Sequence, residues 1–250
     1  MLKTERMDRV RAALRAQGLT QMIVCDPKSV WYLTGVAVEP YERLLALYLP
    51  TEGEPVLFLN RLFNVPEPPC RTVWHTDTDK PVAQIAEVVD AGRPLGIDKE
   101  WPAKFLIPLM ETHPGMQVVL SSDCVDDCRA CKDGEEQALM REASRINDAV
   151  NEAAKHYIKA GMTEREVAEF IDAQFRAHGC EGPSFTTIVS FGANAADPHH
   201  EPDDTVLKEG DCVLFDMGCV KSRYCSDMTR TWFCGQPTEE QAAVLAFVDR

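Results

Sequence analysis

The sequence lacks the features that mark membrane, secreted and nucleic-acid-binding proteins. No stretch approaches the roughly 20 consecutive apolar residues of a membrane-spanning helix. The N-terminal segment is charged and has no apolar signal-peptide core. Basic residues are the minority, since 26 Lys and Arg stand against 40 Asp and Glu for a net charge of −14. A surface that neutralises phosphates needs clustered basic residues. These absences predict a soluble, cytoplasmic protein that binds neither membrane nor nucleic acid.

Cysteine, by contrast, is plentiful, with ten residues in the chain. Disulfides are common in small secreted domains, but no secretion signal accompanies these cysteines. Several lie inside apolar segments, namely Cys25, Cys212, Cys219 and Cys234. A free cysteine in such a segment behaves as a small hydrophobic residue. The sequence therefore predicts reduced thiols.

Three cysteines need separate treatment because of their spacing. Cys124, Cys128 and Cys131 form the C-x3-C-x2-C pattern by which radical S-adenosylmethionine enzymes hold an iron–sulfur cluster. Against this reading, residues 126–132 carry four charges and lead straight into a helical pattern. Incidental thiols at a domain junction are the favoured interpretation, and an iron–sulfur radical enzyme is kept as an alternative.

Strands and helices alternate over the first half of the chain. Apolar runs predict strands, and 3.6-residue periodicity predicts helices. The predicted strands cover residues 22–25, 43–49, 54–59, 95–98 and 117–120, and the predicted helices cover 6–17, 82–90 and 101–112. Residues 64–81 are proline-rich and are predicted to be irregular. This order predicts an α/β domain around a mixed sheet, spanning residues 1–123.

A second domain is predicted over residues 124–250. It begins with a long amphipathic helix over 134–160. Thr163-Glu-Arg-Glu166 is a capping box that opens a second helix ending at Gly179. A strand over 184–190, a loop, a β-hairpin and a final helix from Thr238 follow.

Asp216 and Asp227 carry the strongest chemical signal. They lie in two β-rich segments joined by a short polar link, which predicts a hairpin. If the strands pair symmetrically about Lys221 and Ser222, the two aspartates oppose each other with Cβ atoms about 4.5–5.5 Å apart. Like charges at that separation destabilise the hairpin unless a cation lies between them, and carboxylates suit manganese or magnesium. The pattern predicts half of a dinuclear metal site; two solvated aspartates are the alternative.

These motifs resemble the M24 metallopeptidases, which include Xaa-Pro aminopeptidase, prolidase and creatinase. The resemblance lies in Asp216-x10-Asp227, in Ser-Asp-Met-Thr-Arg-Thr around the second aspartate, and in the upstream Asn194-x3-Pro-His-His200. Tyr32-Leu-Thr-Gly35 is similar to the creatinase-type N-terminal domain. The resemblance implies an α/β (α+β) fold with a creatinase-type mixed-sheet domain followed by the first half of a pita-bread catalytic domain.

The resemblance also implies roles for individual residues. Asp216 would bind one metal ion, and Asp227 would bridge two divalent ions, with manganese expected and cobalt or zinc as alternatives. His199 would be catalytic, hydrogen-bonding the substrate at the scissile peptide, with His200 as a second substrate contact. The implied substrate is a proline-containing peptide cleaved before proline, and the implied assembly is a homodimer. From the residues alone, a loop histidine that caps a turn is the alternative for His199.

The sequence departs from the family pattern after the aspartate pair. M24 enzymes complete the site with a histidine and two glutamates further along, and this sequence has no residue after Arg250. We therefore expect a C-terminally truncated Xaa-Pro peptidase that is inactive as a fragment and binds metal weakly or not at all. A non-catalytic pita-bread binding module is the competing hypothesis.

Overall fold

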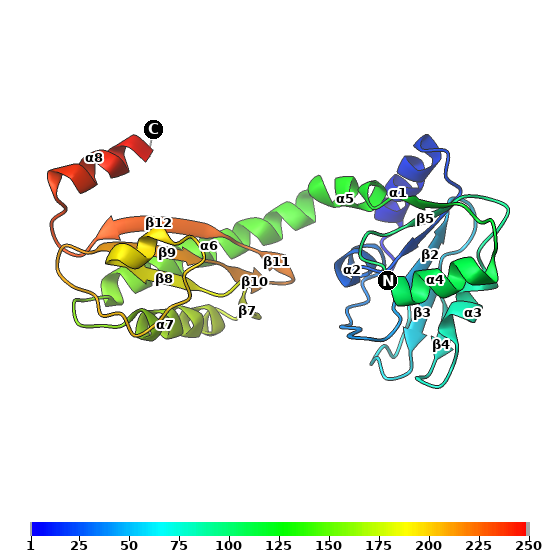
Figure 1. The fold of residues 1–250 in the computed structure, drawn as a ribbon, viewed down its shortest axis with the longest axis horizontal. Helices are drawn as coiled ribbons and strands as arrows, with labels where there is room; N and C mark the ends of the chain where they lie inside the picture. The colour runs from blue at the N-terminus through cyan, green and yellow to red at the C-terminus, as the bar shows by residue number, and fades with distance from the viewer. Residues whose placement is uncertain (1, 249–250) are drawn as a thin grey trace. The chain divides into compact units, whose positions relative to one another are not determined.

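The computed structural model describes residues 2–248 (Figure 1). The chain forms two compact units, one up to Cys131 and one from Lys132 onward. The division predicted from the sequence, at residue 124, lies at the start of helix α5 (Asp123–Ala130) instead of at its end. None of the described helices combines the length and apolarity that crossing a bilayer demands.

The first unit is built on a mixed six-stranded sheet in the order β4-β3-β2-β1-β5-β6. Strand β2 runs antiparallel to both of its neighbours, and the other pairings are parallel. The strands are β1 (Gln21–Val24), β2 (Ala46–Pro50), β3 (Val56–Asn60), β4 (Arg71–His75), β5 (Leu95–Ile97) and β6 (Val118–Leu120). The predicted mixed sheet is confirmed, but the prediction that residues 64–81 are irregular is wrong where β4 forms.

Helices cover both faces of this sheet. They are α1 (Thr4–Ala16), α2 (Pro27–Thr34), α3 (Pro81–Ala86), α4 (Ala103–Thr112) and α5. Met22 and Val24 of β1 belong to the cluster that includes Leu14 of α1, whereas Ile23 between them packs with Leu109 of α4. Because successive side chains of a strand point to opposite faces, one buried strand serves both hydrophobic clusters.

The three spaced cysteines lie on helix α5 and at its end. Cys124 and Cys128 are buried in the hydrophobic core beside α1, and Cys131 is exposed. A helix that directs two of the thiols into the core does not gather all three around a common point. The arrangement gives the iron–sulfur alternative no support.

Thiol reactivity is expected to follow this burial. Burial raises the pKa of the Cys70 and Cys124 thiols to about 11 and that of Cys180 to about 12. Because the thiolate is the reactive form, these thiols stay protonated and slow at pH 8. The exposed Cys131 and Cys225 should take up iodoacetamide first, as peptide mapping after a short pulse would show. Equal labelling of all cysteines in the folded protein would contradict this burial.

The second unit combines two long helices with two small sheets. Its elements are α6 (Gly134–Tyr157), α7 (Glu164–Ala177), β7 (Gly182–Pro183), β8 (Ile188–Phe191), the 3-10 helix η1 (Gly192–Ala196), β9 (Cys212–Met217), β10 (Cys219–Lys221), β11 (Tyr224–Cys225), β12 (Met228–Phe233) and α8 (Glu239–Val248). The sheets have the orders β12-β9-β8 and β11-β10-β7. The capping box predicted at Thr163 and Glu166 is present at the start of α7.

Strand β9 separates the hydrophobic core of this unit from its open side. Val213, Phe215 and Met217 are buried in one cluster with residues of α6 and α7. Leu214 and Asp216, which alternate with them, are only half-buried. The helices therefore cover one face of the sheet and leave the face that carries Asp216 accessible.

Candidate metal site and histidine loop

The hairpin that carries the two aspartates is centred one residue later than predicted. Lys221 of β10 pairs with Tyr224 of β11, so Ser222 and Arg223 form a two-residue turn. Their φ angles are 50° and 67°, and a type I′ hairpin turn requires positive φ at both positions. The predicted symmetry about Lys221 and Ser222 is wrong because neither Ser nor Arg marks such a turn in the sequence.

This shift changes how the aspartates face each other. Thr229 opposes Asp216 across β12 and β9, and continuing the register places Asp227 opposite Gly218. Asp227 and Thr229 lie two positions apart, on the same side of an extended chain. The aspartates are therefore diagonal neighbours on one face instead of a directly opposed pair. Such diagonal positions are about 7–8 Å apart, a separation that carboxylates can bridge through metal ions held about 3.5–4 Å apart.

The two carboxylates could hold a cation, but they offer an incomplete set of ligands. Oδ1 of Asp216 accepts a hydrogen bond of 3.0 Å from the Thr229 hydroxyl. Asp227 is exposed and makes no hydrogen bond or ion pair with the rest of residues 2–248. Carboxylate oxygens are the donors that hard divalent ions prefer. Within the described chain, however, no third His, Cys, Asp or Glu gathers with this pair, so water would fill most of the coordination sphere.

Gly218 allows the close chain approach that places Asp227. Ser184 Oγ donates to the carbonyl of Ser226 at 2.8 Å, and Ser226 Oγ accepts from the amide of Cys219 at 3.0 Å. A Cβ atom on Gly218 would run into the Ser226 carbonyl and the Ser184 hydroxyl. The glycine is therefore needed for packing, a role that sequence reasoning did not assign to it.

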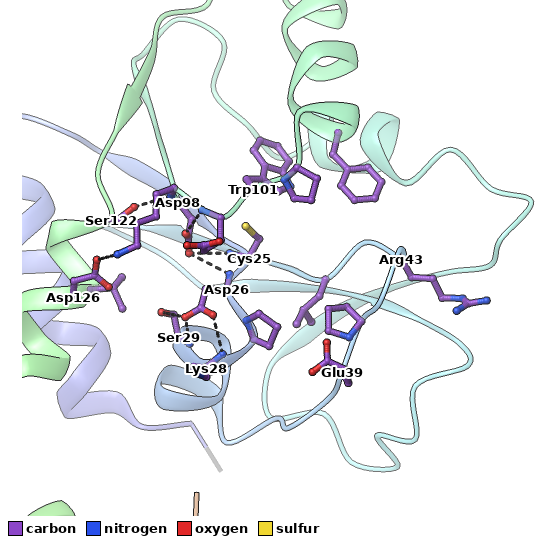
Figure 2. A pocket seen from close by; sticks show the side chains of 18 of the residues that line it. Cys25, Asp26, Lys28, Ser29, Glu39, Arg43, Asp98, Trp101, Ser122 and Asp126 are labelled. Carbon is purple, nitrogen blue, oxygen red and sulfur yellow. Dashed lines mark hydrogen bonds and ion pairs between the residues drawn. The ribbon is translucent and has the colours of Figure 1, made fainter. Parts of the chain in front are cut away.

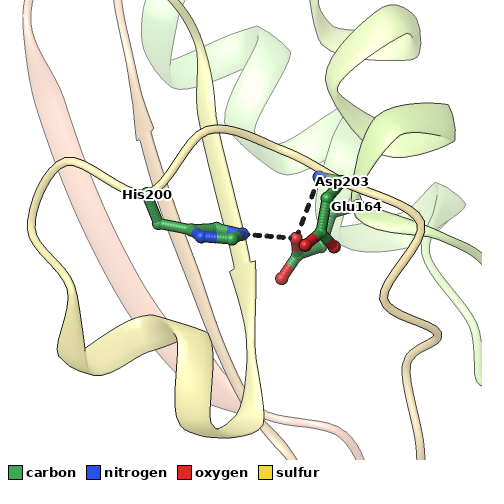
Figure 3. Close-up of side chains that lie close together, drawn as sticks. All are labelled: Glu164, His200 and Asp203. Carbon is green, nitrogen blue, oxygen red and sulfur yellow. Dashed lines mark hydrogen bonds and ion pairs between the residues drawn. The ribbon is translucent and has the colours of Figure 1, made fainter.

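The two adjacent histidines have different environments. His199 is exposed, and its backbone N–H donates to Asp197 Oδ1 at 3.0 Å in a local turn. The side chain of His200 is 15% exposed, and its Nε2 lies 2.6 Å from Oε2 of the buried Glu164 (Figure 3). His199 is therefore open to a ligand, whereas the ring of His200 is engaged by the protein.

Glu164, His200 and Asp203 place potential ligand atoms within 4.8 Å of one another, as a metal site would (Figure 3). The side chain of Glu164, however, already accepts four hydrogen bonds from protein groups. Hydrogen bonds from Thr205 lower the pKa of Asp203, so its carboxylate is also engaged. We interpret this cluster as a hydrogen-bonded anchor of the loop that carries His199 and His200. Sequence reasoning missed Glu164 and Asp203, because position 164 looked like part of an ordinary capping box.

Comparisons with known proteins agree with this architecture. The model of metallopeptidase family M24 matches residues 138–250, and that of the creatinase/prolidase N-terminal domain matches residues 6–131. An uncharacterized peptidase of Staphylococcus aureus is 33% identical over 236 residues, which cover 90% of this chain and 65% of the relative. A second one, from Staphylococcus epidermidis, is 30% identical over 243 residues, which cover 96% of this chain and 69% of the relative. The chain thus spans about two thirds of the length of these relatives.

Solved structures give the same result. A prolidase from Thermococcus sibiricus superposes with a TM-score of 0.91 at 30% identity, over 100% of this chain and 70% of that one. The dipeptidase PepE from Mycobacterium ulcerans superposes with a TM-score of 0.90 at 29% identity, over 99% of this chain and 68% of that one. The expected fold is confirmed: a creatinase-type domain precedes part of the pita-bread domain. The chain belongs to metallopeptidase family M24.

Proposed function

We propose that this chain is part of a metal-dependent peptidase that hydrolyses the bond before proline. The observation that carries the proposal is the placement of Asp216 and Asp227 as diagonal neighbours on the sheet face that the helices leave uncovered. The similar Thermococcus sibiricus protein is a prolidase, which supports proline-containing peptides as the substrate class.

In this proposal the two aspartates bind metal and a histidine contacts the substrate. Asp216 and Asp227 would hold divalent ions, which when bound supply a water of lowered pKa and polarise the substrate carbonyl. His199 is exposed and can offer a hydrogen bond to the substrate at the scissile peptide, where developing negative charge is stabilised. We assign the substrate contact to His199 before His200, because Nε2 of His200 is bonded to Glu164.

Metal binding by this chain alone should be weak. Manganese and magnesium favour six oxygen-rich ligands, and two carboxylates supply a minority of them. We expect manganese to remain largely hydrated on the 250-residue chain and to exchange readily. Manganese is the proposed ion, with cobalt and zinc as alternatives, and the proposed compartment is the cytoplasm.

The test uses native protein isolated from its source, stripped of metal with a chelator and then reloaded with manganese. We expect reloading to restore cleavage of a Gly-Pro dipeptide at least about tenfold faster than that of Gly-Ala. Equal cleavage of both dipeptides would contradict the proline preference. Peptide binding without cleavage, unchanged by metal, would instead favour the non-catalytic binding module.

A further inference from the structure

We infer that Glu164 is a positioning residue for His199, an inference that rests on the proposed substrate contact of that histidine. Glu164 stands in the first turn of α7 and is fully buried. Its two carboxylate oxygens accept hydrogen bonds from four groups, one at the end of β8 and three in the chain that follows. The donors are Phe191 N at 2.7 Å and Asn194 Nδ2 at 3.0 Å to Oε1, and His200 Nε2 at 2.6 Å and Asp203 N at 3.2 Å to Oε2.

These bonds hold the histidine loop, residues 192–205, at three of its residues and at the strand residue that precedes it. Phe191 lies where the loop leaves β8, Asn194 and His200 lie within it, and Asp203 lies near its end. A buried carboxylate needs such donors because its charge has been removed from water. Hydrogen bonds to an ionised acceptor are roughly twice as strong as those between neutral groups. One buried side chain therefore joins the start, the middle and the end of the loop.

The backbone at the start of α7 fixes the end of the same loop. The N–H of Glu164 donates to the carbonyl of Thr205 at 3.2 Å, and that of Arg165 donates to the carbonyl of Asp203 at 3.1 Å. Asn194 Nδ2 also reaches Thr205 Oγ1 at 3.1 Å. The side chain of Glu164 and the backbone N–H groups of Glu164 and Arg165, all in the first turn of α7, thus define the path of the loop.

The position of His199 depends on these hydrogen bonds between α7 and the loop. Its ring is exposed, and within the described residues the ring makes no hydrogen bond or ion pair of its own. Among residues 2–248, His199 is restrained by one hydrogen bond, from its backbone N–H to Asp197 Oδ1. The loop therefore sets where the His199 side chain begins and how far its ring can reach, and the loop is held by Glu164.

Glu164→Gln tests the inference because it preserves shape and replaces one acceptor oxygen with a donor. Two of the four donors then lose their acceptor. One of the two is a backbone amide, that of Phe191 or that of Asp203 according to which oxygen is replaced, and we expect that amide to exchange hydrogen at least about tenfold faster. We also expect kcat for an Xaa-Pro dipeptide to fall at least about tenfold, with a smaller change in KM and in manganese affinity. Glu169→Gln, an exposed position on the same helix, is the matched control and should change neither.

Further variants separate positioning from loss of the fold. Asn194→Ala removes one of the four donors to Glu164, together with the contact to Thr205, and should loosen the loop less than Glu164→Gln while the unit stays folded. In protein that already carries His199→Ala, adding Glu164→Gln should cost no further kcat, because both changes act through one group. The inference is overturned if the losses in kcat of the two variants add up in the double variant. It is also overturned if amide exchange in Glu164→Gln equals that of wild type. If native wild-type protein cleaves no Xaa-Pro peptide, the proposed function fails, and amide exchange alone still decides whether Glu164 anchors the loop.

Discussion

Replacing Asp227 with asparagine is expected to weaken manganese binding at least about tenfold, because it removes one of two carboxylates that face the same open side of the sheet. Asp227 is exposed and unbonded within residues 2–248, so its loss should leave the metal-free fold intact. Removing one of two neighbouring negative charges should leave the thermal stability of the metal-free protein unchanged or slightly higher. Titration with Mn²⁺, followed by electron paramagnetic resonance, measures the affinity directly.

Asp204→Asn provides the charge control for this experiment. Asp204 is exposed and pairs with Arg165 at the surface, so the variant changes net charge by the same amount at a different place. Its manganese affinity should match wild type. Equal weakening by Asp204→Asn and Asp227→Asn would mean that the ion responds to the overall acidity of the protein and not to this pair.

Replacing Gly218 with alanine is expected to destabilise the second unit by about 3 kcal/mol. The new methyl group would collide with the backbone carbonyl of Ser226, which cannot rotate away as a flexible side chain would. Relief of the collision requires the strand before Asp227 to move, so manganese binding should weaken as well. Urea unfolding, followed by near-ultraviolet circular dichroism, gives the change in free energy.

Gly134→Ala is the matched control for this variant. Gly134 is the first residue of α6, and a Cβ atom added there would meet no other atom within 4 Å. Alanine at such a position should be neutral or slightly stabilising, because it favours the helix and restricts the unfolded chain. A Gly218→Ala protein as stable as Gly134→Ala would show that the chains are not in close contact at Ser226.

Much of the fold could be predicted from local signals in the sequence. The buried strands of the first unit are continuous apolar runs, and the helix that follows Thr163 begins with both partners of its capping box in place. Such signals depend on neighbouring residues only, so they can be recognised without the structure. The pair Asp216 and Asp227 could be recognised as a metal-site candidate for the same reason, since its chemistry and strand context lie within one short segment.

The remaining features depend on contacts that local patterns do not encode. The hairpin turns at Ser222 and Arg223, although neither residue type favours positive φ. Helix α2 is different: its local signals, an Asp26 cap before Pro27 and Gly35 at the end, are present in the sequence, yet it was not among the predicted helices. Glu164 is a charged residue that becomes fully buried only because four donors, lying 27 to 39 residues away along the chain, converge on it.

The location of the bound metal is the most direct test of the central claim. Substoichiometric Mn²⁺ added to isotopically labelled protein broadens the amide signals of residues close to the ion. We predict that the signals of Asp216, Asp227 and Thr229 broaden first, while those of His200 and Asp203 persist. Broadening centred on His200 and Asp203 would place the ion at the loop anchor and contradict the assignment of the aspartate pair as the metal site.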